Sequence, residues 1–97
     1  MFAHKIHKGR GEVLLAACDR DVLGKTFKAG QLHFHVNPGF YGQELASRRQ
    51  ILDLLSEAST GNFVGNRLIE ALCEGGVLDE SSVLDVGGVK HAQLVKI

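Results

Sequence analysis

The residues of this chain that are best suited to chemistry are a thiol, a carboxylate, an imidazole and two amides. They are Cys18, Asp19, Asn62, His91 and Gln93. We expect the first two at the end of a strand, the third at the start of a helix, and the last two on a closing strand beside a glycine hairpin. Polar side chains and backbone amides converge at such places. The pattern predicts a site for a small anionic metabolite, or an enzyme with Cys18 as nucleophile and His91 as general base.

Each of these residues also has a structural interpretation. A turn with a buried cysteine is commoner than a reactive thiol. His91 and Gln93 are either satisfied polar groups at the margin of the core or the floor of a pocket. Gly65 joins this set, because a glycine inside a helix costs roughly 1 kcal/mol relative to alanine. It indicates the close approach of another backbone or of a ligand, and packing is the commoner reason.

A second set of residues is basic and gathers in the first part of the chain. Residues 1–43 hold six basic residues against three acidic ones, a net charge of +3, whereas residues 44–80 hold three against seven, a net charge of −4. This asymmetry favours a basic surface that contacts RNA or a ribonucleoprotein. The residues expected to do so are Arg10, Lys25, Lys28 and Tyr41. The alternative is that these charged side chains are only exposed to solvent. The overall net charge of zero also argues against a strongly electrostatic nucleic-acid binder.

The histidine spacing does not complete a metal site. His33 and His35 alternate on an expected strand, so both imidazoles lie on one of its faces. A metal would need a third ligand from His4 or His7 on a neighbouring strand, and no local spacing supplies one. We therefore expect histidines that face solvent, with no metal and no cofactor.

Cysteine usage and hydropathy indicate a cytoplasmic protein. Cys18 and Cys73 are too few and too far apart for a disulfide framework or a Cys-x-x-Cys metal site. No apolar run approaches the ~20 residues of a membrane-spanning helix, and the start of the chain lacks a signal-peptide pattern. We expect a soluble chain with reduced thiols and no membrane partner.

Apolar runs and alternation predict five strands in one domain, residues 1–97. The strands are expected over residues 2–8, 12–17, 31–37, 83–86 and 90–97. The first two form one hairpin, and Gly87-Gly88 joins the last two in another. Such a set of strands favours a mostly antiparallel sheet.

Helical periodicity predicts two main helices. The first covers residues 47–58 and begins with a capping box from Ser47 and Gln50. The second covers residues 62–74, within the segment from Thr60 to Gly76, and either Thr60 or Asn62 would cap it. The expected fold is therefore α+β, a two-layer sandwich in which a mostly antiparallel sheet of about five strands carries both helices on one face.

Several blocks of the sequence look like a small archaeal family known only as a domain of unknown function. The blocks are VLLAACD at 13–19, LGKTF at 23–27, FYG at 40–42, NFVG at 62–65 and GGVKHAQ at 87–93. The resemblance covers roughly residues 4–97, and its motifs are specific only in combination. It implies a cytosolic archaeal protein of two-layer α+β architecture, with a loose association with RNA or translation and no established activity. The family pattern has an acid and a proline where this chain has Asn66 and Lys90, so a role that depends on that acid does not carry over.

A third hypothesis is a structural or dimerisation protein. An exposed patch around Phe40 and Tyr41, in place of a cleft, would support it. A homodimer therefore stands beside RNA and a small anionic metabolite among the expected partners.

Overall fold

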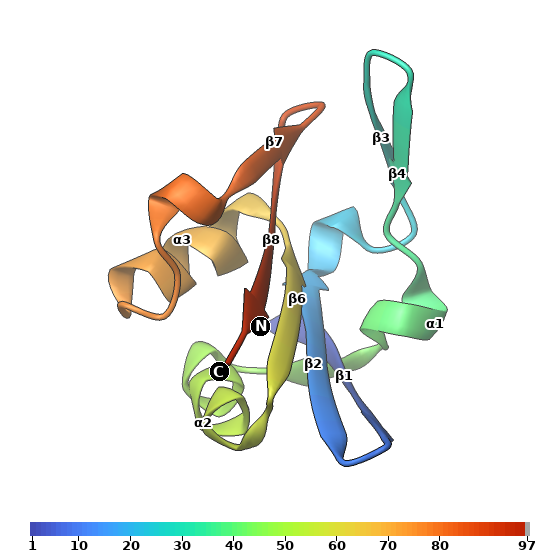
Figure 1. Cartoon of the computed structure of the whole chain (residues 1–97). Helices are drawn as coiled ribbons and strands as arrows, with labels where there is room; N and C mark the ends of the chain where they lie inside the picture. The colour runs from blue at the N-terminus through green and yellow to red at the C-terminus, as the bar shows by residue number, and fades with distance from the viewer. Residues whose placement is uncertain (97) are drawn as a thin grey trace.

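Two parallel strands, β2 (Glu12–Asp19) and β6 (Thr60–Val64), lie in the middle of a six-stranded sheet. The structure is a computed structural model that describes residues 1–96 (Figure 1). The other strands are β1 (Phe2–Gly9), β3 (Thr26–Ala29), β4 (Leu32–His35), β5 (Glu44–Ala46), β7 (Leu84–Val86) and β8 (Val89–Val95). The helices are α1 (Pro38–Tyr41), α2 (Arg48–Glu57) and α3 (Asn66–Glu74), with short 3-10 turns η1 (Arg20–Val22) and η2 (Glu80–Ser82).

The sheet has the strand order β5-β1-β2-β6-β8-β7, and every neighbouring pair except β2–β6 is antiparallel. The α+β class and the mostly antiparallel sheet are therefore confirmed. The predicted count of about five strands is wrong. The strand expected over residues 31–37 pairs as β4 with β3 in a separate hairpin, and both β5 and β6 join the main sheet. β5 has only three residues, too few for alternation to reveal it.

One face of the sheet carries the main core, where α2 and α3 pack together (Figure 1). Leu15, Phe63 and Ala92 project from β2, β6 and β8 into this core. The helices contribute Ile51, Leu55, Leu68, Ile69 and Leu72, all of them buried. Burying one such side chain contributes roughly 1.5–3 kcal/mol, so this face holds most of the apolar stabilisation. No helix within residues 1–96 has the length and apolar character needed to cross a membrane.

The opposite face is covered over only part of its length. A second cluster joins Cys18 and Val64 of the sheet to Val36 and Tyr41, with Phe27 and Phe34 of the β3–β4 hairpin packed against it. Toward the far ends of β6 and β8 the cover stops, and Val95 is 68% exposed. Because α1 and the hairpin form a partial layer here, a simple two-layer arrangement is not confirmed.

The helix expected over residues 62–74 begins later than predicted. Residues 60–64 form β6, whose Phe63 points into the main core, while Asn62 and Val64 point to the opposite face. Helical spacing of apolar residues within the segment hid this strand, because Val64 and Leu68 are also four residues apart. The proposed caps are wrong for the same reason, since Thr60 and Asn62 both lie inside the strand.

The amino end of α3 is capped from another part of the chain. Asp19, at the end of β2, accepts hydrogen bonds from the backbone N–H groups of Arg67 at 3.0 Å and Leu68 at 2.9 Å. Gly65 occupies the N-cap position with φ of +120°. A Cβ atom on Gly65 would lie 2.4 Å from Cγ of Asp19. The glycine is therefore required for packing against a carboxylate.

Three local predictions are confirmed. Ser47 and Gln50 form the capping box of α2, β1 and β2 form a hairpin, and Gly87-Gly88 joins β7 to β8. Ile97, expected on the closing strand, lies outside the described residues.

We expect Gly65→Ala to lower the free energy of unfolding by about 2–4 kcal/mol, because a side chain at this φ is strained and would push Asp19 away from its two amides. Gly76→Ala is the matched control. Gly76 also has a positive φ of +73°, but an added Cβ meets nothing within 4 Å, so backbone strain alone should cost about 1 kcal/mol. Urea unfolding measures both. Equal losses would show that Asp19 accommodates a methyl group without leaving the helix.

Candidate functional site

Three polar side chains from distant parts of the chain meet on the partly covered face of the sheet. The hydroxyl of Tyr41 in α1 donates to Oδ1 of Asn62 in β6 at 2.7 Å, and Nε2 of His91 in β8 lies 3.1 Å from the same oxygen. Since Oδ1 can only accept, the network assigns the His91 proton to Nε2. The amide nitrogen of Asn62 and Nδ1 of His91 then have no protein partner within residues 1–96.

Burial determines the charge state of this polar cluster. It lowers the pKa of His91 below its usual value of 6.5, which favours the neutral imidazole. It also raises the pKa of the Tyr41 hydroxyl, with a smaller contribution from Cys18, so Tyr41 stays protonated and donates. The cluster is therefore uncharged at neutral pH. It offers amide donors and one imidazole acceptor to a partner.

The side chain of Cys18 projects from the same face of the sheet, but it is packed as a core residue. It is fully buried, and its pKa is raised to about 12, first by burial and then by the charges of Asp19 and Asp21. A thiol protonated in this way is a poor nucleophile, because the thiolate is the reactive form. These properties do not support the role of nucleophile for Cys18.

Asp19 and Gly65 belong to the helix cap described above. Burial raises the pKa of Asp19, whereas the hydrogen bonds from Arg67 and Leu68 act in the opposite direction. The carboxylate occupies the place at the start of α3 where an anionic ligand would bind. An anionic metabolite at this helix terminus is therefore not favoured.

Gln93 stands beside Asn62 on an open part of the sheet. The two residues are direct partners in the β6–β8 register, so their side chains share one face. Gln93 is exposed, Asn62 is half-buried, and neither residue lines the surface hollows found on other parts of the molecule. The structure thus brings Asn62, His91 and Gln93 together on one face of the sheet, while Cys18 lies farther along the same face, in the cluster covered by α1 and the β3–β4 hairpin.

The residues expected to bind RNA do not form one patch. Arg10 lies in the β1–β2 turn, at the opposite end of the molecule from the β3–β4 hairpin that carries Lys28 (Figure 1). Lys25 lies at the base of that hairpin. Tyr41 is only 2% exposed, and its hydroxyl is engaged with Asn62. Only Lys25 and Lys28 remain together on an accessible element.

The β3–β4 hairpin has one apolar and one basic face. Phe27 pairs with Phe34 on the face that packs against the second cluster. Lys28 pairs with His33 on the other face, where both residues are exposed. His35 is also exposed, with Nδ1 lying 3.0 Å from the hydroxyl of Thr26. Within residues 1–96, no three His, Cys, Asp or Glu side chains are grouped so as to hold a metal ion.

Sequence reasoning missed the link between Tyr41 and Asn62. It also missed His7, whose ring stacks on Phe40 with centroids 4.8 Å apart and whose Nε2 lies 2.7 Å from the Phe40 carbonyl oxygen. Both links join residues more than twenty positions apart. Neither has a signal in local spacing, because it depends on where α1 packs.

The fold and this surface define a small α+β protein with a partly open sheet face. The chain belongs to a family described as protein of unknown function (DUF424), whose model matches residues 7–97. It is similar to the crystal structure of an uncharacterized conserved protein from Methanopyrus kandleri. That match has a TM-score of 0.81 and 23% sequence identity, and it covers 99% of this chain and 93% of the other. No curated protein matches the sequence. The structural likeness supports the fold alone.

The polar cluster makes stability depend on pH through His91. Because the pKa of His91 is lowered in the folded protein, the unfolded chain binds more protons just below about pH 6.5, and stability falls as the pH falls through that value. We expect the free energy of unfolding of the wild-type protein to drop more than that of His91→Gln between about pH 7.5 and about pH 5.5. The glutamine keeps an N–H donor for Asn62 but does not titrate. Urea unfolding at both pH values tests this, and parallel changes in the two proteins would contradict it.

Proposed function

We propose that this protein is a cytoplasmic RNA-binding protein that contacts RNA through the basic face of its β3–β4 hairpin. The observation that carries the proposal is that residues 22–43 contain no acidic residue and include the β3–β4 hairpin, which projects from the body of the protein (Figure 1). Lys25, Lys28, His33 and His35 are all exposed on it. Contacts to phosphates dominate nucleic-acid affinity, and a projecting basic element can reach them without a deep pocket.

The shape of the candidate site supports an extended partner over a small metabolite. Small ligands are bound in concave sites that bury most of their surface, whereas Asn62 and Gln93 lie on an open sheet face. Single-stranded RNA is commonly bound on such faces, where amides contact base edges. With a net charge of zero, we expect a modest affinity that comes from the hairpin and not from the whole surface.

The proposal predicts that Lys25→Gln/Lys28→Gln weakens binding to a structured RNA and reduces its salt dependence. The slope of log K against log salt concentration should become less steep by about 1–2, because each lysine that neutralises a phosphate releases counterions. Lys8→Gln/Arg10→Gln removes the same charge at the other end of the molecule and is the matched control. Fluorescence anisotropy at two salt concentrations measures both variants. Absence of binding by the wild-type protein at low salt, or equal effects of the two double variants, would refute the proposal.

The hydrogen-bonded cluster of Tyr41, Asn62 and His91 favours a second candidate function, the binding of a small neutral polar molecule. The Asn62 amide has an N–H donor and His91 has an acceptor at Nδ1, and each could meet a complementary group of a nucleobase or a carboxamide. Cys18 and Asp19 are not needed for this role.

For the second candidate we expect nicotinamide or free nucleobases, used as probes, to shift the NMR signals of Asn62 and Gln93 in the wild-type protein. The affinity measured from the Gln93 signals should be at least about fivefold weaker in Asn62→Ala, since loss of a hydrogen-bonding partner costs about 1 kcal/mol or more. Gln31→Ala removes an exposed amide side chain from the β3–β4 turn, away from the cluster, and is the control. If none of these probes moves the signals at millimolar concentration, the cluster has only a structural role.

A further inference from the structure

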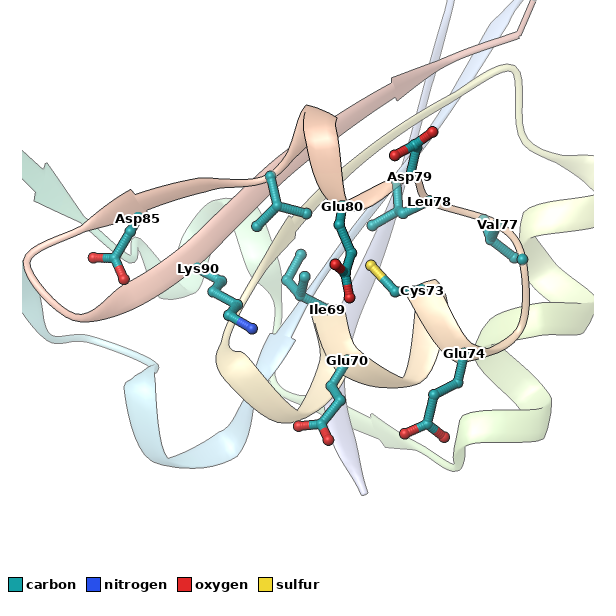
Figure 2. A pocket seen from close by; sticks show the side chains of 12 residues that line it. Ile69, Glu70, Cys73, Glu74, Val77, Leu78, Asp79, Glu80, Asp85 and Lys90 are labelled. Carbon is teal, nitrogen blue, oxygen red and sulfur yellow. The ribbon is translucent and has the colours of Figure 1, made fainter.

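A groove with an apolar floor lies between α3 and the segment that returns to the sheet as β7 (Figure 2). Its volume is about 1050 Å³, large enough for several side chains of a partner. Ile69 and Leu78 form the buried part of the floor, and Cys73, Val77 and Val83 are partly exposed in it. We call this the α3–β7 groove. An apolar floor inside a polar rim is the arrangement found in protein–protein interfaces.

The rim of the α3–β7 groove is acidic. Five carboxylates stand around it, those of Glu70, Glu74, Asp79, Glu80 and Asp85, against the single cation Lys90. Figure 2 shows Glu70 and Glu74 coming from α3 and Glu80 from the segment above it. Acidic charge gathered around apolar surface complements a ligand that carries basic and apolar side chains together.

Three of these five carboxylates already have partners within the protein. Glu74 forms an ion pair with Arg48 at 3.5 Å, the only ion pair within residues 1–96. Asp79 and Asp85 accept hydrogen bonds from the backbone of Ser81 and Gly88. The side chains of Glu70 and Glu80 form no hydrogen bond or ion pair in the described part of the chain. They are therefore the groups best placed to pair with an incoming cation.

We propose that the α3–β7 groove is a docking site for a basic segment of a partner protein, with apolar side chains on the floor and Lys or Arg side chains against Glu70 and Glu80. This surface is distinct from the β3–β4 hairpin, since none of the hairpin residues lines the groove. It does not depend on the proposed binding of RNA. A chain with zero net charge thus has one face for anions and another for cationic peptides.

The two cysteines allow a direct test. Cys73 lies in the floor of the groove, whereas Cys18 is fully buried with its pKa raised to about 12. We expect iodoacetamide to label Cys73 in the native protein and to leave Cys18 unlabelled, which also reports that the fold is intact. A short synthetic peptide of alternating lysine and leucine should slow the labelling of Cys73 at low salt. The same peptide with glutamate in place of lysine should leave the rate unchanged.

Charge variants separate docking in the groove from general attraction. Glu70→Gln/Glu80→Gln should raise the peptide concentration needed for half-maximal protection about fivefold to tenfold, as expected for the loss of two exposed charge pairs. Asp53→Asn/Glu57→Gln removes the same charge from the exposed side of α2 and should have no effect. Three results would overturn the proposal. They are no protection of Cys73, equal effects of the two double variants, and protection that grows with protein concentration without peptide, which would mean that a second copy of the chain covers the groove.

Discussion

The hydrogen bonds from two backbone amides of α3 to Asp19 are the interaction on which the rest of the structure depends. They join the end of the central strand β2 to the start of the helix that covers the main core. The unpaired amides at a helix amino end need an acceptor, and here the sheet provides it. Gly65 makes the contact possible because a side chain there would overlap the carboxylate. Just before Gly65, side chains alternate along β6, so Phe63 points into the main core while Asn62 and Val64 point to the opposite face, where the polar cluster forms.

Local signals predicted much of the fold. The capping box at Ser47, the first hairpin and the glycine turn before β8 depend on residues near one another in sequence, and each was read correctly. The start of α3 could not be predicted in this way, because its cap comes from Asp19, 48 positions earlier. Apolar residues that suit a helix also suit a buried strand, so β6 was concealed. Only the contact between Gly65 and Asp19 distinguishes a buried strand from a helix at this position.

The sequence predicted which residues form the candidate site better than it predicted the role of each residue. Asn62, His91 and Gln93 do meet on one face, because they lie on strands that pair directly. Burial determines the roles of the other residues. It makes Cys18 inert and makes Tyr41 a donor within the protein. This burial depends on how α1 and the β3–β4 hairpin pack, which residue spacing does not predict. The sequence shows that basic residues gather in the first part of the chain. In the folded protein, however, these basic residues lie at opposite ends of the molecule. Residues 44–80, by contrast, place four of their seven carboxylates around the α3–β7 groove.

The parallel pairing of β2 with β6 has a consequence for how the chain is made. The two strands are adjacent in space, yet their paired residues are 46 positions apart in sequence, as in Leu14 and Thr60. At synthesis rates of about 5–20 residues per second, β6 is synthesised roughly 2–10 seconds after β2. During that interval the apolar stretch VLLAA has one unpaired edge, which can pair with another nascent chain. Production of the protein in the cell is therefore expected to depend on translation speed through residues 20–64, or on a chaperone that shields this edge.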